Sequence, residues 1–166
     1  MEEIIELKIN EFENYLGFSI KKQSIPLELN QPHDEHLFYN LSIKFYDKKD
    51  ELNKTIKKTK EILNLLIKTK QNKHIIETYY SLLGNLYYIN AQFNNAAGCF
   101  MKCLTINKND ITSWIELLFT LRCMGKFKLF EKGIFNFEKI YKIWQNDSEN
   151  TFNQKKFLEI IKQINF

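Results

Sequence analysis

The chain has 166 residues, of which 44% are apolar and 14% aromatic, and its formal net charge is +4. This length favours a single domain with a substantial core, and the composition excludes a disordered protein. Only five glycines and two prolines occur, which favours a nearly all-helical chain over a β-sandwich or barrel.

No secretion or membrane signal is visible in the sequence. The first ten residues, MEEIIELKIN, are acidic where a signal peptide is basic, and no apolar run approaches the ~18 residues of a membrane span. The three cysteines show no scaffold spacing, which indicates reduced thiols. We therefore expect a cytoplasmic protein that does not bind membranes.

Residues 1–16 show an amphipathic helical pattern that ends at Gly17. Residues 18–32 contain both prolines and no helical period, which predicts an irregular stretch. It is either a surface linker or a segment that packs along the helices or contacts a partner. Residues 1–33 thus form an N-terminal helix and loop.

Two further helices are expected over 34–46 and about 51–70. The second is amphipathic, with apolar residues on one face and Lys54, Lys57, Lys58 and Lys68 on the other. Between Asp47 and Lys73, nine lysines oppose four acidic residues. This lysine face is either solvated or a site of attraction for phosphate.

Residues 77–110 predict a helix–turn–helix hairpin, with small residues where the two helices touch. The apolar positions are Tyr80, Leu83, Gly84 and Tyr87, followed by Ala96, Phe100, Cys103 and Leu104. Gly84, Ala96, Ala97 and Gly98 are the small residues expected between the helices. Such a hairpin cannot bury its apolar faces without neighbours.

This pattern resembles the tetratricopeptide repeat (TPR). The family's first-helix signature is matched by Tyr80, Leu83-Gly84 and Tyr87, and its turn and second helix by Phe93, Ala96 and Phe100. Cys103 stands where a small alanine is usual and Lys108 where proline is usual, so Asn107-Lys108-Asn109 must end the helix.

The first-helix pattern recurs on both sides of this hairpin. Phe38, Leu41, Ser42 and Phe45 precede it by 42 residues, and Trp114, Leu117, Leu118 and Leu121 follow it by 34, the usual TPR period. We expect an all-α superhelix of three hairpins: 34–73 (divergent), 77–110 (the best match) and 111–145 (divergent). Phe130 replaces the alanine of the third hairpin.

The C-terminal region, 146–166, predicts a capping helix. Residues 146–150 break the preceding helix, and Thr151 to Gln154 has the form of a capping box. An amphipathic segment with several isoleucines follows. Such a helix seals the end of a repeat array, and the whole chain is expected to form one domain.

The resemblance implies a concave groove, lined by the first helices, that holds a peptide or helix of another protein. The residues that it places in this groove are Tyr39, Ile43, Tyr46, Ser81, Asn85, Tyr88, Ile115, Phe119 and Arg122. Tyr and Arg are enriched in binding hot spots. Alternatively, each of these residues packs against the 18–32 loop or against another helix of the same chain.

The sequence thus favours a non-catalytic adaptor, scaffold or chaperone-like accessory protein with a protein partner. The basic clamp used by chaperone-tail adaptors is absent, since Asn85 alone fits it. Self-association is an alternative. A second alternative is nucleic-acid binding by the lysine face of 51–70, but no aromatic or arginine accompanies those lysines on their helix, so this is less favoured.

No catalytic residues, cofactor or metal are predicted. A phosphate-binding glycine loop and a nucleophile elbow are both missing. His33 and His36 are three residues apart, but the sequence shows no further ligands, and they are ordinary residues for a helix start. Cys99 and Cys103 lack the CxxC spacing and are expected in the core.

Overall fold

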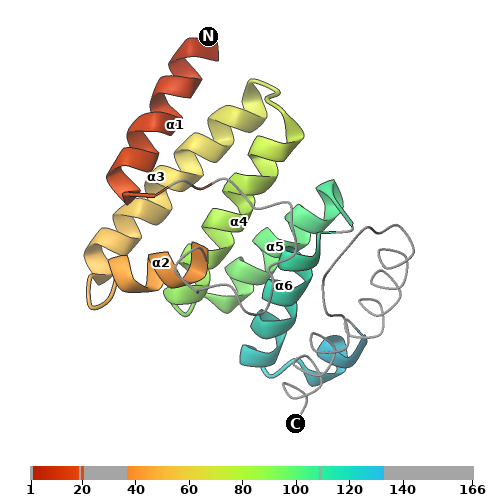
Figure 1. Ribbon diagram of the computed structural model, residues 1–166. Coiled ribbons are helices and arrows are strands. Elements are labelled where there is room, and N and C mark those ends of the chain that lie inside the picture. The colour runs from red at the N-terminus through yellow and green to blue at the C-terminus, as the bar shows by residue number, and fades with distance from the viewer. Residues whose placement is uncertain (1, 19, 21–36, 109, 133–166) are drawn as a thin grey trace, which may run out of the picture.

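The computed structural model describes residues 2–18, 20, 37–108 and 110–132 of the chain, without the side chains of Glu2, Tyr39 and Ile111 (Figure 1). Within these residues the regular structure is entirely helical, which confirms the all-α prediction. The expected capping helix at 146–166 and most of the expected loop lie outside the described ranges. The helices are α1 (Glu2–Leu16), α2 (Leu37–Lys44), α3 (Lys49–Lys68), α4 (Lys73–Ile89), α5 (Phe93–Ile106) and α6 (Ile111–Cys123), and residues 127–132 are also helical.

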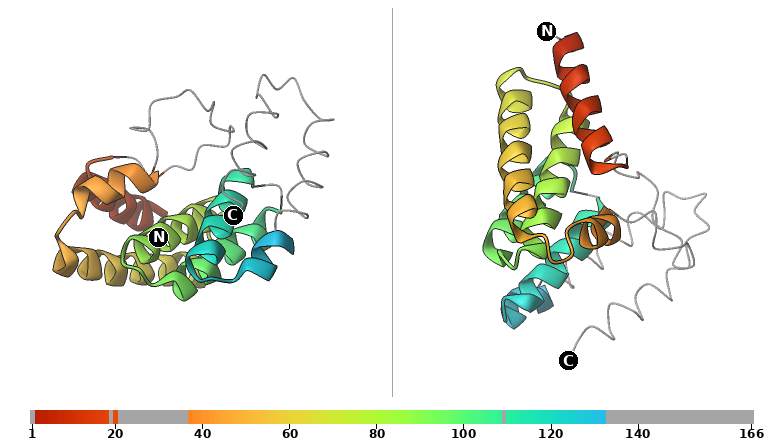
Figure 2. Two further views of the ribbon diagram at one scale, coloured as in Figure 1. Left: turned by 90° about the horizontal axis from the view of Figure 1, so that it is seen from below. Right: turned by 90° about the vertical axis from the view of Figure 1, so that its left-hand side faces the viewer.

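Helices α3 to α6 pack in series, each against the next: α3 against α4, α4 against α5, and α5 against α6. Figure 1 shows this row running from yellow to cyan. Helices α1 and α2 lie over α3 and α4 as a second layer (Figure 2). Among the described residues, no helix is sufficiently long and apolar to cross a lipid bilayer.

The tightest helix contact joins α4 and α5. A Cβ placed on Gly84 would lie 2.6 Å from Cε1 of Phe100, so the absence of a side chain allows the ring to lie against the α4 backbone. Ala96 and Ala97 are buried close by, as expected. Gly98 was predicted to share this contact, but it is exposed and a Cβ there would meet nothing within 4 Å. One small residue of the set therefore lies outside the helix interface.

The same hydrogen-bonded turn ends α3, α4 and α6. In each case an N–H reaches back five residues to a carbonyl: Gln71 to Leu66, Gln92 to Tyr87, and Lys126 to Leu121. The preceding residue is left-handed in all three turns, at Lys70, Ala91 and Gly125. This is the Schellman arrangement for ending a helix. The turns after α4 and α6 are 34 residues apart, so the sequence period is also a period of backbone geometry.

Helix α1 belongs to the same core as the helix row. Phe12 and Leu16 are buried, and the ring of Phe12 stacks on that of Tyr79 in α4 with their centroids 6.3 Å apart. The hydroxyl of Tyr15 lies 3.3 Å from Oγ1 of Thr55 in α3. Helix α1 thus packs against α3 and α4, in agreement with its sequence pattern, and ends at Gly17, whose φ is +82°.

Helix α2 differs from the first helix of a regular hairpin. The backbone of its described part, Leu37–Lys44, packs against α4 instead of lying along α3. Leu41 and Phe45 are its buried contacts.

Candidate partner-binding surface

Tyr88, in the last turn of α4, joins four elements of the fold. Its ring meets those of Phe38 (α2) and Phe93 (α5) edge to face, with centroid distances of 5.5 and 5.3 Å. Its hydroxyl lies 3.1 Å from Sγ of Cys123 in α6. Burial raises the pKa of Tyr88, and the hydrogen bond with Cys123 raises it further, whereas Arg122 lowers it. The phenol is therefore a neutral hydrogen-bonding group at neutral pH.

Exposed apolar side chains lie on two of the helices that contact Tyr88. Phe38 is 40% and Phe119 37% exposed, and Phe119 lies one helical turn before Cys123 on α6. Arg122 is half-buried on the same helix and carries a positive charge to this region. We name Phe38, Tyr88, Phe119, Arg122 and Cys123 the Tyr88 surface.

Part of the predicted groove coincides with the Tyr88 surface. Tyr88, Phe119 and Arg122 belong to it, and Ile115 is half-buried one turn before Phe119. The structure therefore brings the predicted residues of α6 and the C-terminal turn of α4 to one region.

Ser81 and Asn85 were also predicted to line the groove, but both are buried, each 2% exposed. The side-chain amide of Asn85 donates to the Ser81 carbonyl at 2.8 Å and to Oε1 of Glu116 at 2.9 Å. Asn85 therefore connects α4 to α6 inside the protein, and its amide is not available on the surface. The cause is the close approach of α6, which a first-helix pattern alone does not specify.

Ile43 and Tyr46 are exposed, by 59% and 76%. Helical geometry places Ile43 on the side of α2 opposite the buried Leu41 and Phe45. The side chain of Tyr39 lies outside the described part of the structure. The α2 residue whose ring meets Tyr88 is Phe38, which is not one of the predicted groove residues.

The sequence places Cys123 near the groove and partly exposed, and the structure shows it exposed, but Phe38 and Phe93 are not among the predicted groove residues. Phe38 aligns with Tyr80 in the first-helix pattern. It reaches Tyr88 because α2 packs on α4 and not along α3. The exposure of Phe38 depends on this tertiary arrangement, for which no local pattern gives a signal.

The described residues offer few groups for chemistry. Cys99 and Cys103 are buried as expected, and burial raises the pKa of the Cys99 thiol to about 12, although Lys60 opposes the shift. Among the described side chains, no three His, Cys, Asp or Glu lie close enough to hold a metal ion. His33 and His36 are not among the residues described.

The Tyr88 surface is thus a group of aromatic side chains with a thiol and a guanidinium, suited to contact and hydrogen bonding. Its residues come from α2, α4 and α6, and Phe93 of α5 packs against Tyr88, so its shape depends on how these four helices pack. Comparison with protein-family models, curated proteins and solved structures finds no match to this chain.

Proposed function

We propose that the protein is a TPR-like, non-catalytic interaction module that binds a helix or peptide of another protein at the Tyr88 surface. The TPR assignment is supported by the motif residues, by the close approach of Phe100 to Gly84, and by the turn that recurs after 34 residues. An adaptor, scaffold or chaperone-like role would follow from this binding.

The observation that carries the proposal is the exposure of Phe38, whose ring meets that of Tyr88, and of Phe119, one helical turn before Cys123 on α6. Two exposed aromatics beside a fixed tyrosine and an arginine match the residue types that dominate protein interfaces. Tyr88 is held by contacts to three other helices, so its ordering is complete before a partner arrives. A partner would insert an apolar side chain beside the tyrosine.

The test is a pull-down from a lysate of the source cells at about 0.1 M and about 0.5 M salt. The test variant is Phe38→Ser/Phe119→Ser, which keeps the contacts of Tyr88 with Phe93 and Cys123. The matched control is Ile4→Ser/Leu7→Ser on α1, where the side chains are 59% and 58% exposed. Circular dichroism verifies that both variants keep their helix content.

We expect the wild type and the α1 control to retain one protein at both salt concentrations and the Phe38/Phe119 variant to lose it. Equal retention by all three would place the partner elsewhere and overturn the proposal. A second copy of the chain is the other possible occupant of the surface. Light scattering during size-exclusion chromatography detects it as a dimer that the Phe38/Phe119 variant does not form.

A further inference from the structure

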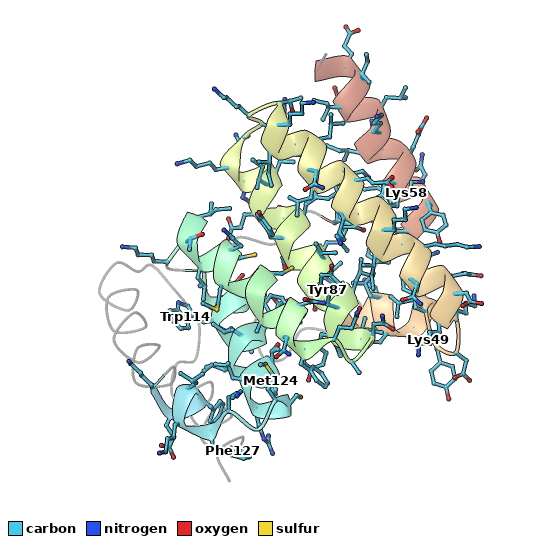
Figure 3. The ribbon with its side chains drawn as sticks, turned by 180° about the vertical axis from the view of Figure 1, so that it is seen from behind. Lys49, Lys58, Tyr87, Trp114, Met124 and Phe127 are labelled. Carbon is cyan, nitrogen blue, oxygen red and sulfur yellow. The ribbon has the colours of Figure 1, made fainter. Side chains whose placement is uncertain are left out.

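A second surface, separate from Tyr88, combines two lysines with an exposed tyrosine. The ammonium group of Lys44 (α2) lies 5.0 Å from the ring centroid of Tyr15 (α1), and that of Lys58 (α3) lies 5.4 Å from it. Three successive helices, α1, α2 and α3, therefore converge here. Figure 3 shows Lys58 on the side of α3 that adjoins α1.

Tyr15 is fixed in place and still accessible. Its hydroxyl is 3.3 Å from Oγ1 of Thr55, its ring stacks near Phe12, and the side chain remains 42% exposed. A tyrosine held at its hydroxyl end with part of its ring in solvent is a preformed stacking platform.

The two lysines have no anionic partner within the described residues. The interactions of Lys44 are with the rings of Tyr15 and Phe45, and those of Lys58 with the rings of Phe12 and Tyr15. Neither ammonium group has a counter-charge among the described residues, so a bound anion would supply one.

The positive charge continues along α3. Lys54 lies one helical turn before Lys58, Lys57 adjoins it in sequence, and both are exposed. Glu11 lies one turn before Tyr15, and Glu51 one turn before Thr55, which restricts the positive region to a short track. Such a track can contact about three phosphates.

We propose that Tyr15, Lys44 and Lys58, with Lys54 and Lys57, form a site for single-stranded nucleic acid. Phosphates would pair with the lysines, and one base would displace a lysine head group from the ring and stack on Tyr15. An acidic peptide would pair with the lysines but gain little from the ring. In a duplex the bases are already stacked and cannot reach it. The site is independent of the function proposed for the Tyr88 surface.

The experiment is fluorescence anisotropy of the full chain with a 5′-fluorescein-labelled oligouridylate and oligothymidylate of about twelve nucleotides, a typical length for such sites. Competitors are a duplex of equal length and polyglutamate of equal charge. The variants are Lys44→Gln/Lys58→Gln, Tyr15→Leu and Tyr15→Phe. Lys102→Gln/Lys128→Gln, at exposed positions on α5 and in 127–132, is the control of equal net charge.

We expect Tyr15→Leu to raise Kd at least about fivefold and Tyr15→Phe to leave it nearly unchanged, since stacking requires the ring. The Lys44/Lys58 variant should raise Kd about tenfold, and the charge control less than about twofold. Three phosphate contacts predict a loss of affinity of roughly twentyfold between about 50 and 200 mM salt.

The proposal is overturned if the charge control weakens binding as much as the Lys44/Lys58 variant does. It is also overturned if duplex or polyglutamate competes as well as the single strand, because the ring would then have no role. Tyr15→Leu could disturb α1, so circular dichroism accompanies it. The lysine variants, which replace the half-buried Lys44 and the exposed Lys58 by glutamine, decide the outcome if Tyr15→Leu unfolds.

Discussion

The ring of Phe100 occupies the space in which Gly84 would carry a side chain, because a Cβ there would lie 2.6 Å from Cε1 and 2.9 Å from Cζ. Phe100 is 1% exposed, so its ring cannot swing into solvent. We predict that Gly84→Ala lowers the free energy of unfolding by about 2 kcal/mol. Urea denaturation monitored by circular dichroism measures the change.

Gly98→Ala is the internal control, since its added methyl would meet nothing within 4 Å. Its higher helix propensity should raise the free energy of unfolding by up to about 1 kcal/mol. An equal gain in stability for Gly84→Ala would contradict the prediction, because it would show that the Phe100 ring can move to accommodate the added methyl group.

Ala91 and Gly125 provide a reciprocal test of the recurring turn. Both residues are left-handed, with φ of 58° and 69°, and they have equivalent hydrogen bonds. A left-handed L-residue costs about 1 kcal/mol. Ala91→Gly should therefore raise the free energy of unfolding by about 0.5–1 kcal/mol, and Gly125→Ala should lower it by a similar amount. Thermal and urea unfolding of the two variants should change in opposite directions, and a shared direction would contradict the equivalence of the turns.

The buried amide of Asn85 should be essential for the α4–α6 contact. Removing it leaves Oε1 of Glu116 without this donor in the interior, so Asn85→Ala should lower the free energy of unfolding by about 2–3 kcal/mol. A double-mutant cycle with Glu116→Ala should give a coupling energy of about 1–2 kcal/mol. The exposed Asn64→Ala, with an expected change within about 0.5 kcal/mol, is the control. Coupling near zero would mean that the two side chains act independently.

Tyr79 has a buried hydroxyl for which the described residues offer no hydrogen-bond partner. Burial raises the pKa of this phenol, and the charge of Glu13 raises it further. Because the hydroxyl loses its hydration without compensation, Tyr79→Phe should leave the free energy of unfolding unchanged or raise it by up to about 1 kcal/mol. Tyr88→Phe, which loses the contact with Cys123, should lower it by about 0.5–1 kcal/mol. A clear loss of stability in Tyr79→Phe would reveal a partner for its hydroxyl.

The three cysteines should differ in reactivity. Cys123 is exposed, whereas Cys99 and Cys103 are buried. At about pH 8, a colorimetric thiol reagent should label one thiol rapidly, and the other two only at the rate of local opening. Cys123→Ser should abolish the rapid phase, and a rapid phase that persists in this variant would show that a buried thiol is accessible.

The raised pKa of Cys99 also predicts a loss of stability in alkali. Below pH 9, the thiol is protonated in both the folded and the unfolded chain, so its contribution is fully present. Between about pH 9 and 12 the unfolded chain loses the proton first, and the free energy of unfolding falls. Cys99→Ala should show a smaller fall over this range, and an identical fall would assign the effect to other groups, such as Tyr79 and Tyr88.

The helical content and several helix boundaries follow from local sequence. The pattern of 1–16 ends at Gly17 because glycine adopts the left-handed conformation there, and α1 accordingly spans Glu2–Leu16. Gly84 is expected from the sequence where the two helices touch, and the structure shows that Phe100 is the residue that fills the space beside it. These features are set by residues close together in the chain, so the local sequence pattern is sufficient to predict them.

The surfaces depended on contacts that no local pattern specifies. Asn85 was expected on a groove and is buried, because α6 approaches it with Glu116. Phe38 belongs to the first-helix pattern and is exposed, because α2 packs on α4. Likewise, Tyr15 meets Thr55 across 40 residues of sequence, so a pattern read along α3 alone shows lysines without an aromatic.

The docking of α1 has a consequence for the order of folding. Contacts within the row from α3 to α6 join consecutive helices, so the row closes only short loops as it forms. The Tyr15–Thr55 contact instead closes a loop of about forty residues, which carries a larger entropic penalty. The row should therefore form first, with α1 added last and released first on unfolding. In that partly unfolded state, the side of Tyr79 that Phe12 covers would face water. Exposed apolar surface of this kind favours incorrect association between chains during synthesis.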